Sequence, residues 1–398
     1  MSESHHKEPL LPLLDTYTPP AADLDRLGRI GLIVGGVAAV VTAALAFADL
    51  TQFYRSYLVG FVWVFGITLG CFGLMTLHHL SGGGWGVMIR RVLEAATRTI
   101  PLLAILFVPN ALGMKHLYSW ARPEGHEEGF RGEYLTQNGF ILRAVFAFVV
   151  LSVFAFLLSY MSARQDETGD PALRRRMQRV SSGGALLYVL VMTACAVDWL
   201  MSLSPKWVST IYGFYVIAGQ VVAALSFVIL MSLFLSTRAP LAGRFKADHF
   251  HDYGKLLLAF VMIWAYFAAS QLIIIWSGNL PEETSWYMAR TNPGWKVFSV
   301  GLIFAHFVLP FVLLLSRNLK RDRKRLARVA IMMLAVRWLD LYWLAAPAFS
   351  DDAMIHVLDL TTPVALLGFW FFAFTRQLKV RSLLPLNDRF LKGALGHG

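Results

Sequence analysis

The sequence predicts an all-α integral membrane protein with about ten transmembrane helices. The chain of 398 residues is 57% hydrophobic and only 15% charged, which excludes an ordinary soluble protein. Apolar runs long enough to cross the hydrocarbon layer recur along nearly its whole length. The formal net charge of +11 comes from basic residues that flank these runs, so it indicates membrane topology and predicts no nucleic-acid partner.

Each element follows from applying a span of about 20 apolar residues along the chain. Residues 1–28 are polar, of mixed charge and proline-containing, and we expect them to form a cytoplasmic N-terminal arm. Residues 378–398 form a basic cytoplasmic tail. Between them the sequence predicts helices at 29–49, 56–80, 90–113, 138–162, 180–203, 207–236, 253–277, 295–316, 326–347 and 354–377.

The loops on one side of the predicted spans carry most of the basic residues. Arginines and lysines concentrate at 164–179, 238–255, 317–328 and 376–392, a roughly threefold excess over the opposite loops. This excess predicts that both chain termini face the cytoplasm, in agreement with an even number of spans.

A weak internal likeness between residues 53–60 and 211–215 predicts that the helices form two groups. The first four-helix bundle would comprise 56–203 and the second 207–347, that is, helices 2–5 and 6–9. The helices at 29–49 and 354–377, helices 1 and 10, would flank them as peripheral helices. Aromatic belts at the membrane interfaces could produce the same likeness.

The stretch from Met75 to Arg98 is the most unusual part of the chain. An apolar helix ends in His78 and His79, a glycine-rich turn follows, and the next helix carries Arg90, Arg91, Glu94 and Arg98. Spacings of three and four residues can place these four side chains on one helical face. Ionisable groups are costly inside a bilayer, so they usually face a partner charge, the bundle interior or water.

The ionisable and polar residues inside the spans sort by depth into two half-paths that could conduct protons. Glu94–Arg98 and Arg337–Asp340 could instead be structural ion pairs that tie helices together. The candidates are His78, His79, Glu94 and Arg98 on the inner side, and Tyr266, His306, Asp198, Arg337 and Asp340 in the middle and on the outer side.

The sequence predicts no catalytic residue, no metal site and no resident cofactor. A bis-histidine haem site needs two well-buried histidines, and only His306 lies near the middle of a span. Cys71 and Cys195 are far apart in apolar segments, which is typical of packing residues. A quinone needs an apolar slot with one or two polar groups. Ser270 and Gln271 are the candidates for these, and Tyr266 and His306 could also contribute.

With these residues in view, the chain resembles the NrfD/polysulfide-reductase family of membrane subunits. More narrowly, it is similar to the second NrfD-like subunit of bacterial alternative complex III, a quinol:electron-acceptor oxidoreductase. The likeness covers roughly residues 28–380, and its motifs are His78–Ala95 with the glycine turn, Asp198–Gly213, Gly254–Phe260 and Trp276–Glu283.

This resemblance implies ten helices in two bundles and a non-catalytic, cofactor-free subunit in the bacterial cytoplasmic (inner) membrane. It implies lipid contacts, a paralogous NrfD-like subunit, an iron–sulfur protein and c-type cytochromes as partners. Menaquinol or quinone, haem c and iron–sulfur clusters would belong to those partner subunits, and this chain would supply proton half-channels. Two alternatives remain open: a subunit that binds quinol itself, and a stand-alone secondary transporter.

Overall fold

The computed structural model describes residues 17–125 and 130–396. Residues 1–16 of the expected N-terminal arm and the last two residues of the expected tail therefore lie outside the described residues. Within the described ranges every regular element is a helix, and ten helical segments are long and apolar enough to cross a membrane. This confirms the all-α class and the predicted number of candidate spans, and it indicates a multi-pass membrane protein.

The spans that consist of one helix follow the predicted order. They are α2 (Ala21–Ala46), α3 (Leu50–Ser81), α10 (Gln137–Thr168), α11 (Pro171–Trp199), α12 (Tyr212–Leu235), α13 (Ala247–Gly278), α18 (Arg323–Ala345) and α19 (Val357–Leu378). The turns η3 (Met201–Leu203) and η5 (Ala346–Ala348) extend α11 and α18. Several helices exceed the predicted ranges because their polar ends continue beyond the apolar run; α2, for example, begins directly after Pro20.

Two spans are interrupted. The third consists of α5 (Arg90–Thr97), α6 (Ile100–Leu106) and α7 (Val108–Leu112), and the eighth of α15 (Pro293–Ile303), the π-helical turn η4 (Phe304–Val308) and α16 (Leu309–Leu315). Pro101 lies in the first turn of α6. Backbone N–H groups in the first turn of a helix have no partner within the helix, so proline is tolerated there. The third span is therefore broken just before Pro101, between α5 and α6.

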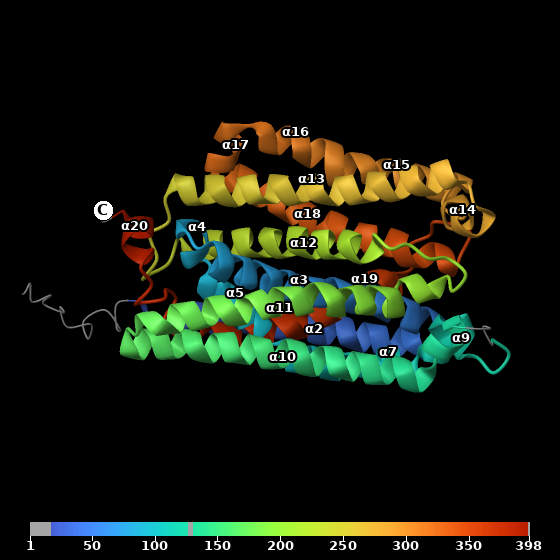
Figure 1. Ribbon diagram of the computed structural model, residues 1–398, viewed down its shortest axis with the longest axis horizontal. Coiled ribbons are helices and arrows are strands. Elements are labelled where there is room, and N and C mark those ends of the chain that lie inside the picture. The colour runs from blue at the N-terminus through green and yellow to red at the C-terminus, as the bar shows by residue number, and fades with distance from the viewer. Residues whose placement is uncertain (1–16, 126–129, 397–398) are drawn as a thin grey trace, which may run out of the picture.

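Short helices cover the two ends of the molecule, while the long helices lie side by side with nearly parallel axes (Figure 1). At one end lie α8 (Met114–Leu117), η2 (Ser119–Ala121), α9 (Phe130–Tyr134) and α14 (Pro281–Met288). At the other lie α4 (Gly84–Val87), α17 (Arg317–Arg321) and α20 (Leu391–Leu395).

The centre of the protein is the contact between α3 and α12. These two spans are the most buried, whereas α2, α13 and the eighth span expose most of their surface. A Cβ atom on Gly70 of α3 would lie 2.1 Å from the carbonyl oxygen of Gln220 on α12. Small residues allow such close approach of helices in membranes. Around this pair, α11 and α19 pack on α3, α13 and α18 pack on α12, and α2 packs mainly on α19.

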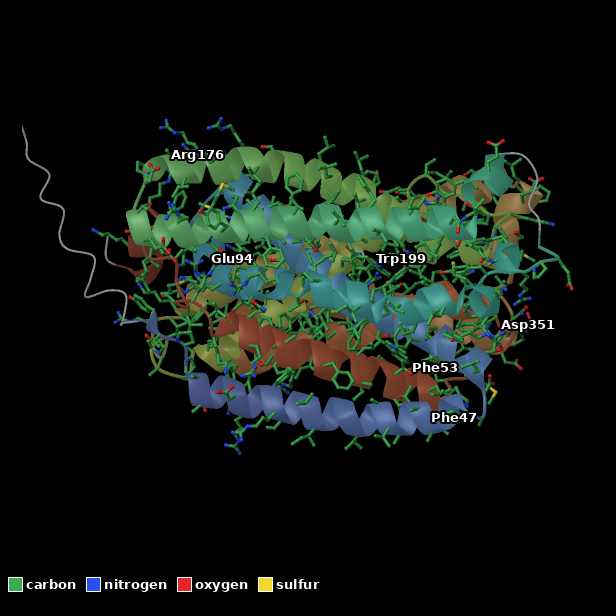
Figure 2. The ribbon with its side chains drawn as sticks, turned by 90° about the horizontal axis from the view of Figure 1, so that it is seen from below. Phe47, Phe53, Glu94, Arg176, Trp199 and Asp351 are labelled. Carbon is green, nitrogen blue, oxygen red and sulfur yellow. The ribbon has the colours of Figure 1, made fainter. Side chains whose placement is uncertain are left out.

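The C-terminal tail folds back over the end of the helices that carries α4 and α20. Leu383, Leu384 and Leu386 are buried, and the Leu383 amide donates to the carbonyl oxygen of Tyr17. Apolar tail residues buried in this way attach the tail to the helical core. The tail therefore brings charged side chains to the same end as Glu94 and Arg176 (Figure 2).

Candidate functional site

The first buried ionic site is centred on Glu94, which is 1% exposed. Arg90 Nε lies 3.0 Å from Glu94 Oε1, and Arg91 Nη1 lies 2.6 Å from Glu94 Oε2. The hydroxyl of Ser162 on α10 donates to Glu94 Oε1 at 2.5 Å and accepts hydrogen bonds from both arginines at 2.8 Å. The predicted common face of Arg90, Arg91 and Glu94 is confirmed, because one carboxylate joins both guanidinium groups.

Carboxylates from residues distant in sequence balance the positive charges of Arg90 and Arg91. Asp388 of the tail lies 3.0 Å from Arg90, and Asp166 of α10 pairs with Arg91. Arg381 of the tail lies 3.8 Å from Glu94 and donates to Ser159 at 2.9 Å. Three cations thus face three carboxylates, so burial leaves the charge of this Glu94 cluster balanced.

Arg98 takes a different position from the one considered from sequence. Its guanidinium donates to the carbonyl oxygen of Gln377 at 2.6 Å, near the C-terminal end of α19. Within the described residues Glu94 pairs with Arg90, Arg91 and Arg381, so the Glu94–Arg98 pair is not formed. Arg98 follows the last residue of α5, where the backbone leaves the helix that carries Glu94.

His78 and His79 lie beside the glycine turn, with ring centroids 5.6 Å apart. His78 is 3% exposed and meets the edge of Trp85 at 5.5 Å. His78 Nδ1 and His79 Nε2 are buried and have no hydrogen-bond partner among the described residues. Because a buried, unsatisfied polar group is costly, these nitrogens are candidate positions for water or a transferred proton.

Gly86 makes the position of His78 possible, because a Cβ atom there would lie 2.1 Å from His78 Nδ1. We expect Gly86→Ala to displace the imidazole and to lower the free energy of unfolding by about 1–2 kcal/mol, a modest overpacking cost. Thermal unfolding in detergent measures this effect. Gly84→Ala is the matched control, since its Cβ would lie 3.8 Å from Ala394. Equal stability of the two variants would contradict this account.

The second buried site is centred on Asp340 of α18, which is 0% exposed. Arg337, one turn earlier, pairs with Asp340, which confirms the predicted ion pair. Tyr215 of α12 donates to Asp340 Oδ1 at 2.7 Å, and Trp264 of α13 donates to Oδ2 at 3.1 Å. The carboxylate thus joins three spans. A Cβ on Gly219 would lie 2.2 Å from Arg337 Cζ, so this glycine gives the guanidinium its space.

His306 lies next to the Asp340 site. Its ring stacks on Trp264 at a centroid distance of 3.7 Å, and its Nε2 lies 3.9 Å from Asp340 Oδ2. The residue is 0% exposed, and neither ring nitrogen has a hydrogen-bond partner in the described part of the chain. It belongs to η4, and π-helical turns occur frequently at functional sites.

Asp198 lies apart from Asp340, near the end of α11. Arg143 of α10 binds both carboxylate oxygens, at 2.8 and 3.0 Å, and stacks over the Tyr134 ring at 3.9 Å. This bidentate pair was not predicted, because nothing in the spacing of residues on α10 and α11 links the two positions. Asp198 therefore ties two neighbouring spans together near the end of the molecule that carries α9.

The remaining predicted residues do not join these clusters. Tyr266 is 65% exposed on the outer surface of α13, and Ser270 is half-buried. Gln271 is buried, accepts from Ser209 at 3.0 Å and donates to Tyr287 at 3.2 Å. Its amide already links α13 to α14 and to the loop before α12.

The sequence analysis also missed buried polar residues that have no oppositely charged residue three or four positions away in the sequence. The Tyr188 hydroxyl donates to Gln220 at 2.9 Å beside the α3–α12 contact. Arg290, just after α14, is 4% exposed and lies 3.3 Å over the ring of Trp286. Burial lowers the pKa of Arg290 to about 9, which leaves the guanidinium charged at neutral pH.

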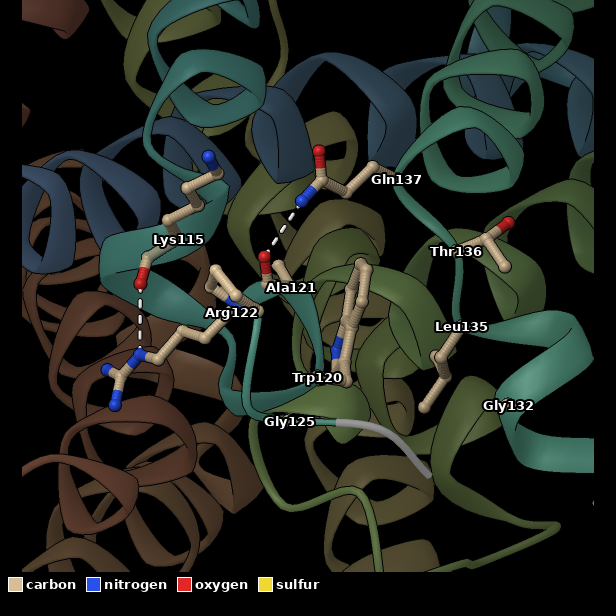
Figure 3. A pocket seen from close by; sticks show the side chains of 10 residues that line it. Lys115, Trp120, Ala121, Arg122, Gly125, Gly132, Leu135, Thr136 and Gln137 are labelled. Carbon is tan, nitrogen blue, oxygen red and sulfur yellow. Dashed lines mark hydrogen bonds between the residues drawn. The ribbon is translucent and has the colours of Figure 1, made fainter. Parts of the chain in front are cut away.

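One cavity of about 300 Å³ lies between η2 and the start of α10 (Figure 3). Arg122 Nε donates to the Lys115 carbonyl at 3.1 Å, and Gln137 donates to the Ala121 carbonyl at 2.8 Å. None of the residues proposed from sequence as sites lines it. In the described ranges, no three histidine, cysteine, aspartate or glutamate side chains come together as a metal site.

Among the described residues, the fold and these sites define a multi-pass helical protein with separate buried ionic clusters around Glu94 and around Asp340. No protein-family model and no curated protein matches the chain.

Proposed function

We propose that this chain is a cofactor-free integral subunit of a quinol-oxidising membrane complex of the alternative complex III type. It supports assembly and provides proton half-channels coupled to quinol oxidation in a paralogous subunit. The proposal rests on the resemblance of its motifs, on ten candidate spans, and on ionisable groups buried inside those spans.

The environment of His306 is the main observation that supports proton conduction. A histidine changes charge near neutral pH in most surroundings, and this one is buried beside an Arg337–Asp340 pair with both ring nitrogens free of partners among the described residues. Tyr215 continues the site toward Tyr212, whose buried hydroxyl also lacks a partner there. In this proposal His306 exchanges protons with Asp340, and the tyrosines lead to the outer surface.

The inner half-channel would begin at His78 and His79 and pass the Glu94 cluster, with Arg98 beside it. The fully paired state of Glu94 suits a gate or a fixed charge, whereas the free nitrogens of the histidines suit proton exchange. Asp198 would mark the outer end.

The orientation and grouping of the helices are part of the same proposal. The basic loops favour cytoplasmic termini. The packing of α3 with α5 and α11, of α10 with α11, and of α12 with α13 and α18, is compatible with two four-helix bundles. In the bacterial inner membrane, the exposed surfaces of α2 and α10 would contact lipid, a paralogous subunit or redox-active partner chains.

The test is His306→Phe in the complex purified through a tag on this chain and reconstituted into liposomes. Phenylalanine keeps the stacking on Trp264 but cannot carry a proton. We expect quinol oxidation to continue, while proton release falls to the protons that the oxidation itself liberates. A pH-sensitive dye and the acceptor spectrum measure both quantities.

Tyr266→Phe is the control, because the exposed Tyr266 lies outside the Asp340 site, and it should leave the proton yield unchanged. An unchanged yield in His306→Phe would remove the conducting role. A tagged preparation that contains no c-type haem and oxidises no quinol would contradict the proposed complex itself.

A further inference from the structure

Arg290 is a buried cation for which the described residues supply no counter-ion. Its guanidinium donates to the carbonyl oxygens of Trp286 at 2.7 Å and Leu344 at 2.9 Å, and it lies over the Trp286 and Trp343 rings. Among the described residues no carboxylate lies within ion-pair distance of it. Carbonyl and ring contacts orient the group, but they do not neutralise its charge. By contrast, the buried Arg90, Arg91 and Arg337 each face a carboxylate.

Arg290 lines a cavity of about 310 Å³ at the end of the molecule that carries α14. Ser119, Ser204 and Ser285 also line it, and Lys206, which is exposed, adds a second positive charge. No acidic residue is among the described residues that line it. The described lining therefore combines two cations and three serines with apolar residues such as Trp207 and Trp286.

Two buried donors on the lining residues are left unused. Arg290 Nε and Trp207 Nε1 have no hydrogen-bond partner in the part of the chain that the structure describes. Both groups can only donate. Trp207 stacks on Trp286 at 4.6 Å with nearly parallel rings, so this wall of the cavity is rigid. A negatively charged hydrogen-bond acceptor would both accept from the unused donors and neutralise the unpaired cation.

We propose that this cavity, which we call the Arg290 pocket, binds a small oxyanion, a phosphate or carboxylate group. Arg290 supplies a buried positive charge, the exposed Lys206 supplies a second one, and the serine hydroxyls donate hydrogen bonds to the oxyanion. The pocket involves none of the residues proposed for proton transfer, so its existence does not depend on the proposed function.

The experiment measures thermal unfolding of the full chain in detergent micelles, with inorganic phosphate, acetate or chloride at matched ionic strength. A ligand that binds only the folded state raises the unfolding temperature. We expect phosphate or acetate to stabilise the wild type more than chloride does. Arg290→Gln should weaken the apparent affinity at least about 30-fold, as expected when a buried charge partner is removed.

Lys206→Gln provides a variant whose folding is not in question, because Lys206 is exposed and forms no ion pair with the described residues. It should weaken the affinity roughly two- to fivefold, as expected for a charge at the rim, and leave the unfolding temperature without ligand unchanged. Lys115→Gln, in the cavity of Figure 3, is the matched control and should have no effect.

A short-chain phosphatidic acid distinguishes a lipid headgroup from a dissolved anion. Stabilisation by inorganic phosphate would show that the ligand is a dissolved oxyanion. Stabilisation by the lipid alone would show that it is a lipid headgroup. Either result supports the Arg290 pocket if Lys206→Gln weakens the stabilisation. Equal stabilisation by phosphate, acetate and chloride, or an effect that Lys206→Gln and Arg290→Gln leave intact, would overturn the proposal.

Discussion

Glu94→Ala is expected to lower the free energy of unfolding by about 3–5 kcal/mol, the usual effect of removing one partner from a buried ion pair. The variant would leave three cations, Arg90, Arg91 and Arg381, facing only the two carboxylates of Asp166 and Asp388. It would also leave the Ser162 hydroxyl without the carboxylate to which it donates its hydrogen bond. Thermal or denaturant unfolding of the purified chain in detergent measures the loss, and we expect a much lower yield of folded protein.

A double-mutant cycle separates the ion pair from the rest of the site. Arg91→Met alone should also destabilise the protein, because it leaves Asp166 without its arginine. The double variant Glu94→Ala with Arg91→Met should cost clearly less than the sum of the two single variants, since it removes one charge of each sign. Additive effects would show that Glu94 and Arg91 contribute independently and would contradict the described cluster.

Gly70→Ala is expected to disrupt the centre of the fold. The added Cβ would lie 2.1 Å from the Gln220 carbonyl oxygen and 2.6 Å from its carbonyl carbon. Backbone atoms cannot rotate away as a side chain can, so α3 and α12 must separate along a contact that both helices bury. We expect a loss of about 3 kcal/mol, the upper end of the range for overpacking. Unfolding in detergent again gives the measurement.

Gly66→Ala provides the comparison, one turn earlier on the same helix. Its Cβ would lie 3.4 Å from Gln220 Cγ, which is an ordinary van der Waals contact. We expect this variant to be neutral or slightly stabilising, because alanine favours the helix over glycine. If both variants unfold alike, the close approach of α3 and α12 at Gly70 is wrong.

The two ionic sites differ in a way that matters for the proposed function. In the Glu94 cluster three cations and three carboxylates satisfy one another, with the tail supplying Asp388 and Arg381. Such a cluster holds the helices and the tail in one arrangement. At Asp340 the ion pair is complete, but the adjacent His306 is not hydrogen-bonded to any described residue. In the proposed function, His306 is therefore the group at the Asp340 site that exchanges protons.

The sequence by itself determined the helical class and the number of candidate spans, and it predicted the Arg337–Asp340 ion pair, whereas the Glu94–Arg98 pair considered on the same grounds does not form. Length and apolar content suffice for the first two, because a membrane span must satisfy its own backbone hydrogen bonds as a helix. Arg90–Glu94 and Arg337–Asp340 follow from spacings of four and three residues, which place side chains on neighbouring helical turns.

Only the tertiary structure decided which side chains face inward and which distant residues meet. Tyr266 and Gln271 both lie on the predicted seventh helix, yet one is exposed and the other buried. A membrane helix that is apolar nearly all round carries no periodic pattern from which its rotation can be predicted. Asp388 reaches Arg90, and Tyr215 and Trp264 reach Asp340, because packing at Gly70 and the folded tail bring separate segments together. Long-range partners depend on this packing, and helical spacing within one segment carries no information about it.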